Sequence, residues 1–168
     1  AFRKLKQRVL WKFEGDIPNL PDNVMIRKWM PQNDILAHKN IILFISHGGL
    51  YGTMEGTSRG VPMLFIPLFA DQHCNALKSV ERGHALMQTL SEITVDTFTE
   101  KLMEIIDNPK YIKTAKQMSI LFNDNIVSPK KTAMYWIEYV IKHRGAPHLK
   151  SKSVNLPLYK QLLLDILF

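Results

Sequence analysis

Two apolar runs in the middle of this chain are each followed closely by polar residues suited to bind a phosphate or a sugar. Residues 41–45 precede Ser46-His47-Gly48-Gly49, and residues 63–66 precede Asp71-Gln72. Short runs of β-branched and aromatic residues are typical of strands buried on both faces of a parallel sheet. Adjacent glycines let the backbone turn sharply and let a ligand come close. We therefore expect an anion-binding turn after the first strand and a second polar turn after the next.

A helix is expected between these two strands, over residues 50–59. Its first turn would direct unpaired N–H groups toward the glycine turn, and such a helix N-terminus favours phosphate. The His47 imidazole would add a hydrogen-bond donor to the same anion. The strand at 63–66 would run parallel to the first and complete a βαβ unit. Asp71 and Gln72 would then lie at the strand-end edge where open α/β sheets bind ligands.

Three further residues complete the set of candidates. Trp29 and Gln32 belong to the segment W-M-P-Q-N-D, and Glu55 lies in the predicted helix. Each candidate taken singly has an ordinary explanation, because tryptophans pack in cores, paired glycines form turns and aspartates cap helices. The ordered combination is far more specific than any one of its members.

In this order the residues closely resemble the donor-binding signature of the UDP-glycosyltransferases, the UDP-glucuronosyl and UDP-glucosyltransferase family. The matching pieces are W-x-P-Q-N-D at 29–34, S-H-G-G at 46–49, Glu55, and P-L-F-A-D-Q at 67–72. The segment K-H-R-G-A-P-H-L at 142–149 is similar to the animal membrane-bound branch, and we expect an insect member. The resemblance covers nearly the whole chain, but only most of the C-terminal domain of the usual protein.

The resemblance implies an α/β fold in which a Rossmann-like parallel sheet is flanked by helices, as the C-terminal half of a GT-B glycosyltransferase. Residues 1–145 would form the UDP-sugar donor-binding domain. Its start looks truncated, because the strand and Gly/Ser loop that the family places first are absent. Residues 146–168 would form a tail that leads toward an absent C-terminal membrane anchor. The resemblance further implies an endoplasmic reticulum membrane protein that faces the lumen and acts in detoxification.

Roles at the nucleoside end of the donor follow from the same resemblance. Trp29 would stack on the uracil ring, since a flat apolar ring face suits a flat base. Gln32 would hydrogen-bond the nucleoside. Glu55 would accept hydrogen bonds from the ribose hydroxyls, because a carboxylate is a strong acceptor for a vicinal diol.

At the other end of the donor, the resemblance implies contacts with the diphosphate and the sugar. His47 would contact the diphosphate and stabilise it, and Asp71 and Gln72 would hold the sugar hydroxyls. Many relatives have asparagine at the position of Tyr51, so a side-chain amide contact would be lost here while a backbone contact would remain. Besides His47, the residues implied for the diphosphate are Ser46, Gly49, Tyr51 and Gly52.

The implied reaction is an inverting transfer of a sugar from a UDP-sugar to a small lipophilic acceptor. UDP-glucose is the donor expected of an insect member, and UDP-glucuronate that of a vertebrate one. The general base, a histidine supported by an aspartate, would lie on an N-terminal domain together with the acceptor site. No catalytic base is therefore expected in this chain, and the fragment alone is expected to be inactive. No metal and no cofactor besides the UDP-sugar co-substrate are expected.

Composition limits other classes of function. The 168 residues suffice for a domain with its own core, and no run of eighteen apolar residues would span a bilayer. Cys74 is the single cysteine, which excludes an internal disulfide, and no Cys/His spacing fits a metal site. The net charge of +7 raises a nucleic-acid hypothesis. The basic residues lie at the two ends of the chain, however, rather than in one stripe with aromatic residues between them.

Three other functions compete with the transferase hypothesis. A nicotinamide dehydrogenase fails because the glycine segment reads G-G-L-Y-G at 48–52 instead of G-x-G-x-x-G. A catalytically silent UDP-binding or partner-docking module stays open, and the departure at Tyr51 gives it some weight. A nucleic-acid binder would bind any polyanion with strong salt dependence and without preference for uridine.

The elements around the central stretch follow from local patterns. Strands are expected at 9–13 and 24–28, and the second would deliver Trp29 to the strand-end face. Residues 2–7 are expected to be the end of a helix, and Asp34 is expected to cap a short helix.

The C-terminal half is expected to be mostly helical. Helices are expected at 72–81 and 110–122, with a strand at 84–87 between them. A capping box at Thr97–Glu100 would start a further helix, and Ser128 would cap the last one. The apolar stripe of that last helix is expected to be core. Its members are Ala133, Trp136, Ile137, Val140 and Ile141.

Overall fold

The computed structural model describes residues 1–166. The chain divides into two compact units, one formed by Ala1–Asp124 and one that begins at Asn125. This division is one of packing. The predicted boundary at residue 145 concerns donor binding and stays a prediction.

The first unit contains two parallel sheets. Strand β1 (Val9–Lys12) pairs with β2 (Val24–Arg27), and β3 (Phe44–Ser46), β4 (Met63–Phe65) and β5 (Ala85–Met87) pair in the order β3-β4-β5. Every pairing is parallel. The predicted α/β fold with a helix-flanked parallel sheet is therefore confirmed.

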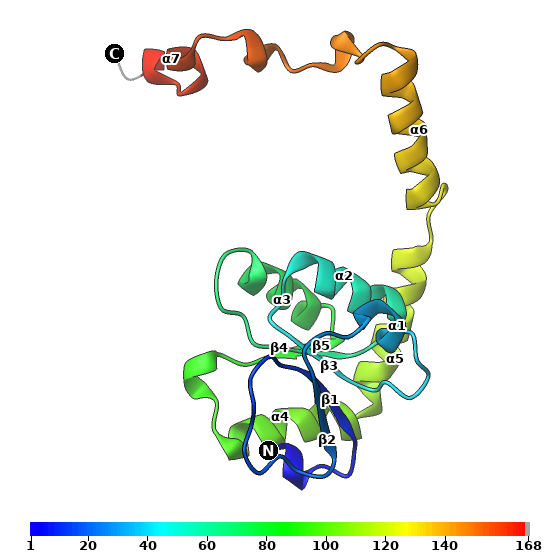
Figure 1. Ribbon diagram of the computed structural model, residues 1–168, viewed down its shortest axis with the longest axis vertical. Coiled ribbons are helices and arrows are strands. Elements are labelled where there is room, and N and C mark those ends of the chain that lie inside the picture. The colour runs from blue at the N-terminus through cyan, green and yellow to red at the C-terminus, as the bar shows by residue number, and fades with distance from the viewer. Residues whose placement is uncertain (167–168) are drawn as a thin grey trace. The chain divides into compact units, whose positions relative to one another are not determined.

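Helices cover both faces of the three-stranded sheet (Figure 1). Helix α2 (Leu50–Arg59) and helix α3 (Gln72–Glu81) lie on one face and have the predicted bounds. Helix α4 (Val95–Asp107) lies on the opposite face, and α5 (Pro109–Asn123) packs against α2.

The core of the first unit is arranged around β4, whose three residues are fully buried. Successive side chains of a strand point to opposite faces of its sheet. Met63 and Phe65 accordingly pack with Ala76 of α3, whereas Leu64 packs with Leu102 and other residues of α4. Burial of this strand from both sides fixes the place where its carboxyl end emerges.

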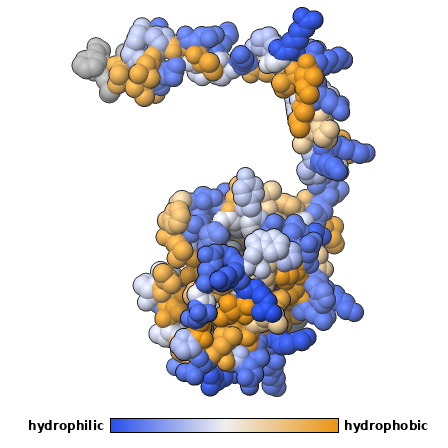
Figure 2. Space-filling model, viewed as in Figure 1, coloured by the Kyte–Doolittle hydropathy of each residue, from blue (hydrophilic) through white to orange (hydrophobic). Residues whose placement is uncertain are grey.

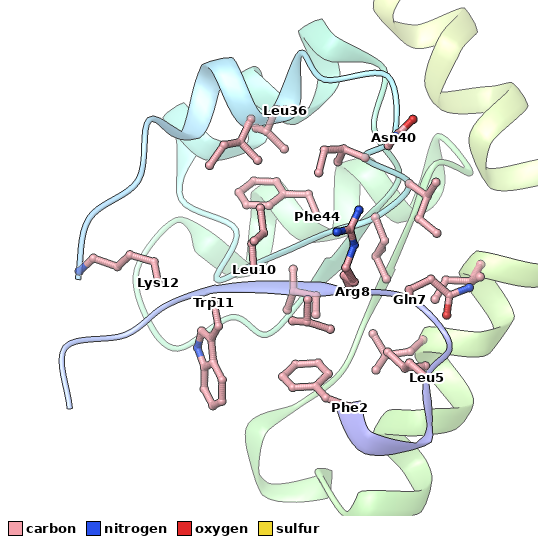
Figure 3. A pocket seen from close by; sticks show the side chains of 18 of the residues that line it. Phe2, Leu5, Gln7, Arg8, Leu10, Trp11, Lys12, Leu36, Asn40 and Phe44 are labelled. Carbon is pink, nitrogen blue, oxygen red and sulfur yellow. The ribbon is translucent and has the colours of Figure 1, made fainter. Parts of the chain in front are cut away.

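The first strand of the predicted βαβ unit is shorter and less buried than expected. It begins at Phe44 rather than at residue 41, and its residues are only half-buried. A cavity of about 500 Å³ separates β3 from β1, so that β3 is an edge of its own sheet. Figure 3 shows Leu10 and Leu36 on one side of the β1 ribbon and Phe2 and Trp11 on the other. The cavity is thus lined by apolar side chains from both sheets.

Two predictions for the N-terminal segments were wrong in detail. Residues 2–7 do not continue as a helix, because the 3₁₀ turn η1 (Phe2–Lys4) ends at Leu5, whose backbone is extended. Helix α1 (Gln32–Leu36) begins before Asp34, which lies in its first turn, and Pro31 occupies the N-cap position.

Helix starts in the C-terminal half follow local chemistry closely. The capping box before α4 is formed by Thr94 and Thr97 instead of by Thr97 and Glu100, so the helix begins earlier than predicted. Asn108 caps α5 through its side chain, directly before the proline that separates α4 from α5. A further 3₁₀ turn, η2 (Leu90–Glu92), precedes α4.

The second unit consists of one longer helix and a tail of short turns. Ser128 caps α6 (Pro129–Lys142) as predicted, but no residue of this helix is buried. The apolar stripe is therefore exposed rather than core, and Figure 2 shows apolar side chains at the surface of this segment. The tail contains η3 (Pro147–Leu149), η4 (Lys152–Asn155), α7 (Leu158–Gln161) and η5 (Leu164–Ile166). Within residues 1–166, no helix is long and apolar enough to cross a membrane.

A buried histidine makes the stability of the first unit sensitive to acid. His84 is fully buried, and neither of its ring nitrogens has a hydrogen-bond partner. Burial, with a smaller contribution from the positive charge of Arg82, lowers the pKa of His84. The unfolded chain therefore takes up this proton at a higher pH than the folded chain does.

We expect the free energy of unfolding to decrease as the pH falls below about 6.5, by at most about 1.4 kcal/mol per pH unit. Urea unfolding between about pH 8 and pH 5 measures this loss. The unfolding free energy of the His84→Leu variant should depend less on pH than that of the unmodified chain. The His38→Gln variant, which lacks an exposed histidine, should keep the pH dependence of the unmodified chain. Equal pH dependence in His84→Leu and the unmodified chain would contradict the assignment.

Candidate functional site

The residues predicted for the diphosphate and the sugar lie at or just after the carboxyl ends of β3 and β4, whereas Trp29 and Gln32 follow β2 and Glu55 lies within α2. The two strands are parallel neighbours, with Ser46 paired in register with Phe65. The turn that contains His47 follows β3, and the loop that leads to Asp71 follows β4. Parallel pairing therefore brings the His47 turn and the Asp71 loop to one edge of the sheet, as predicted.

Gly48 is the residue that the turn after β3 requires to be glycine. Its φ of +84° lies in the left-handed region. A Cβ at this position would lie 2.7 Å from the carbonyl oxygen of Gln72. The Gly48 N–H also donates to Ser46 Oγ at 3.4 Å, which assigns Ser46 a role within the turn.

The N-terminus of α2 faces the same turn without a side-chain cap. Gly49 is the N-cap residue, so the N–H groups of the first helical turn receive no side-chain acceptor from it. A Cβ on Gly49 would lie 2.5 Å from His47 Nε2, which shows that the imidazole lies against this turn. His47 is exposed, and Tyr51 in the first turn is 82% exposed. An anion here would meet both the helix N–H groups and the imidazole.

Two of the residues predicted for the nucleoside, Gln32 and Glu55, lie beside this turn. Gln32 Nε2 donates a hydrogen bond to Glu55 Oε2 at 2.6 Å and so links α1 to α2. A Cβ on Gly52 would lie 3.5 Å from Ser46 Oγ and 3.9 Å from Gln32 Nε2, which places all of these groups together. The second oxygen of Glu55 leaves acceptor capacity for a hydroxyl. Trp29 follows β2 and is 75% exposed, so a ring face is open to a base.

The two residues predicted for the sugar differ in their surroundings. Gln72 is only 6% exposed, and its Oε1 accepts hydrogen bonds from the N–H groups of Leu68 and Phe69 at 2.8 and 3.2 Å. This oxygen holds the loop after β4, so sugar binding by Gln72 would have to use its Nε2. Asp71 is exposed and occupies the N-cap position of α3 without making a side-chain cap bond.

Asn75 joins the site although the sequence reasoning missed it. Its Nδ2 donates to Asp71 Oδ2 at 2.8 Å and to the carbonyl oxygen of Gly48 at 3.1 Å. A usable signal was its spacing, because residues four apart on a helix lie on the same face. The contact with Gly48 could not be foreseen, since it depends on how α3 packs against the turn after β3.

The described residues contain no metal cluster and one large cavity beside the site. No group of three or more His, Cys, Asp and Glu side chains is placed to hold a metal among residues 1–166. Gln32 is the predicted site residue that lines the 500 Å³ cavity between the two sheets, and the lining of that cavity is largely apolar. Such a lining does not suit a diphosphate, which needs hydrogen-bond donors.

The helix-flanked parallel sheet is the architecture of the chain's structural neighbours, which are GT-B glycosyltransferases. The whole chain, residues 1–168, matches the family model described as "UDP-glucoronosyl and UDP-glucosyl transferase". The chain belongs to this family.

Two curated relatives show the range of the family. The chain is 49% identical over 168 residues to UDP-glycosyltransferase UGT5 of Dactylopius coccus, which covers 99% of the chain and 32% of that protein. It is 40% identical, with the same coverage, to UDP-glucuronosyltransferase 2B15 of Rattus norvegicus. The chain thus spans about a third of the length of the curated relatives it matches.

One solved relative contains a donor. The structure of Medicago truncatula UGT71G1 complexed with UDP-glucose superimposes with a TM-score of 0.63 at 27% identity, over 72% of this chain and 30% of that one. The ligand contacts of individual residues in this chain stay predictions.

The close approach at Gly48 yields a stability prediction with an internal control. Gly83 also has a positive φ, +79°, but a Cβ there would lie 3.8 Å from its nearest neighbour, Thr114 Cγ2, which is ordinary van der Waals contact. Gly83→Ala should cost about 1–2 kcal/mol of unfolding free energy from backbone strain alone. Gly48→Ala should cost a further 1–3 kcal/mol, roughly, because the Gln72 carbonyl must move. Urea unfolding of both variants measures the difference, and equal losses would show that the approach of Gly48 to α3 is not tight.

Proposed function

We propose that this chain binds a UDP-sugar as the donor-binding part of a glycosyltransferase that transfers the sugar with inversion to a small lipophilic acceptor. The observation that carries the proposal is the direct Gln32–Glu55 hydrogen bond beside the uncapped N-terminus of α2 and the His47 turn. One edge of the fold thus offers a carboxylate that can accept hydrogen bonds from ribose hydroxyls, next to N–H groups that can donate to a diphosphate.

The geometry suggests how this part would promote the reaction. As the bond between the sugar and UDP breaks, negative charge builds on the β-phosphate. Fixed N–H groups at the start of α2 and the exposed His47 imidazole would stabilise this charge, because they are oriented before it develops. Asp71 would accept hydrogen bonds from sugar hydroxyls and hold the anomeric carbon for attack. Trp29 would hold the uracil ring.

The acceptor and the general base belong in this proposal to a part of the protein outside this chain. The base would be a histidine supported by an aspartate, and it would take the proton of the acceptor hydroxyl. UDP-glucose is our proposed donor, in keeping with the 49% identity to an insect relative, and UDP-glucuronate is the second choice. We further propose attachment to the endoplasmic reticulum membrane on the lumenal side through a C-terminal anchor, with detoxification as the role.

A catalytically silent UDP-binding or partner-docking module is the second candidate function. Tyr51 favours it, because its exposed ring stands at the first helical turn of the proposed diphosphate site. Sugar transfer by the full-length protein would rule it out, whereas donor binding without transfer would support it.

Calorimetric titration with UDP, UMP and ADP tests donor binding by the 168-residue chain. UDP should bind more tightly than either UMP or ADP. Trp29→Ala should make the binding free energy of UDP less favourable by about 1–3 kcal/mol, because base stacking is lost. His47→Ala should weaken UDP binding by about tenfold and UMP binding by less, because a hydrogen-bond donor to the charged second phosphate is lost.

Two matched controls distinguish effects at the proposed UDP site from the effect of removing any exposed tryptophan or histidine. Trp136→Ala removes another exposed tryptophan, and His38→Ala another exposed histidine, and both should leave UDP affinity unchanged. Equal weak binding of all three nucleotides, with the strong salt dependence of nonspecific polyanion binding, would refute the proposal.

A further inference from the structure

Asn75 connects the two turns that form the site. It lies in the first turn of α3, is half-buried, and uses one amide nitrogen for two hydrogen bonds. One goes to the Gly48 carbonyl oxygen in the turn after β3, and the other goes to Asp71 Oδ2 in the loop after β4. A side-chain amide carries two N–H donors, so this pair of contacts uses both.

The contact with Gly48 has a consequence for the neighbouring peptide N–H. In a planar trans peptide the carbonyl and the following N–H point in opposite directions. Because Asn75 holds the Gly48 carbonyl toward α3, the N–H of Gly49 is directed away from α3. The same bond keeps a partial negative charge, the carbonyl oxygen, from turning toward a bound anion.

The contact with Asp71 fixes a carboxylate that is otherwise exposed. The hydrogen bond to Oδ2 restricts the rotation of the Asp71 side chain and leaves Oδ1 as an acceptor. A side chain held in its binding conformation loses less entropy when a ligand arrives. A sugar hydroxyl would therefore gain more from this carboxylate than from a freely rotating one.

We propose that Asn75 is a positioning residue that couples the diphosphate-binding turn to the Asp71 carboxylate and thereby sets how much the sugar diphosphate adds to donor affinity. The inference rests on the proposed function of the site. It assigns Asn75 no contact with the nucleoside, so the binding of uridine alone should not depend on it.

Titration of the 168-residue chain with uridine, UDP and UDP-glucose tests this role. Asn75→Ala should leave the uridine affinity within about twofold and lower the UDP-glucose affinity by about tenfold or more. UDP should show an intermediate loss, because it uses the turn but not Asp71. The Asn75→Asp variant should bind UDP-glucose more weakly than the Asn75→Ala variant does. The introduced carboxylate would face that of Asp71 and would repel the diphosphate.

Asn123 provides a matched control, because its amide also makes two backbone contacts, with the carbonyl oxygens of Ser58 and Ser119. Asn123→Ala should lower the urea midpoint but leave the ratio of UDP-glucose to uridine affinity unchanged. If Asn75→Ala lowers the affinities for uridine, UDP and UDP-glucose equally, or lowers none of them, the inference is overturned while the proposed function stands. If the unmodified chain binds UDP-glucose no better than uridine, the proposed function fails and the coupling fails with it.

Discussion

Burial of β4 between two helical layers is the constraint on which the rest of the first unit depends. Its side chains alternate between the α3 side and the α4 side, so neither layer can shift without opening the core. With β4 fixed, parallel pairing fixes the end of β3 beside it. The His47 turn and the Asp71 loop then meet at one edge, as ligand sites of open α/β sheets do.

Several site residues bind other parts of the protein as well as offering groups to a ligand. Glu55 accepts a hydrogen bond from Gln32, and Asp71 accepts one from Asn75. The side-chain oxygen of Gln72 accepts a hydrogen bond from the loop after β4. Such internal bonds orient the polar groups in advance, at the expense of some of their capacity to contact a ligand. In the proposed function, the N–H groups at the start of α2 and the imidazole of His47 are the donors left for an anion.

The two units differ in how they use apolar residues. The first unit buries strands and helices around a shared core, whereas no residue of the main helix of the second unit is buried. Rings of Tyr135, Trp136 and Tyr139 contact one another along α6, and the Tyr139 hydroxyl lies 2.7 Å from His148 Nε2. Local contacts of this kind order a helix and its following turn without forming a core.

The sequence by itself determined the type of most elements and which residues were candidates for the site. The bounds of α2 and α3, the parallel sheet and the glycine turn after β3 could all be predicted, because short-range patterns and local backbone demands specify them. Helix starts at Asp34 and Thr97 were misplaced by a few residues, since several polar residues nearby could serve as caps. Tertiary structure alone decided the cavity between β1 and β3, the exposure of α6, and the bonds from Asn75 and Gln72. Those features depend on which surfaces pack against one another across the fold, and the periodicity of a sequence does not specify such long-range contacts.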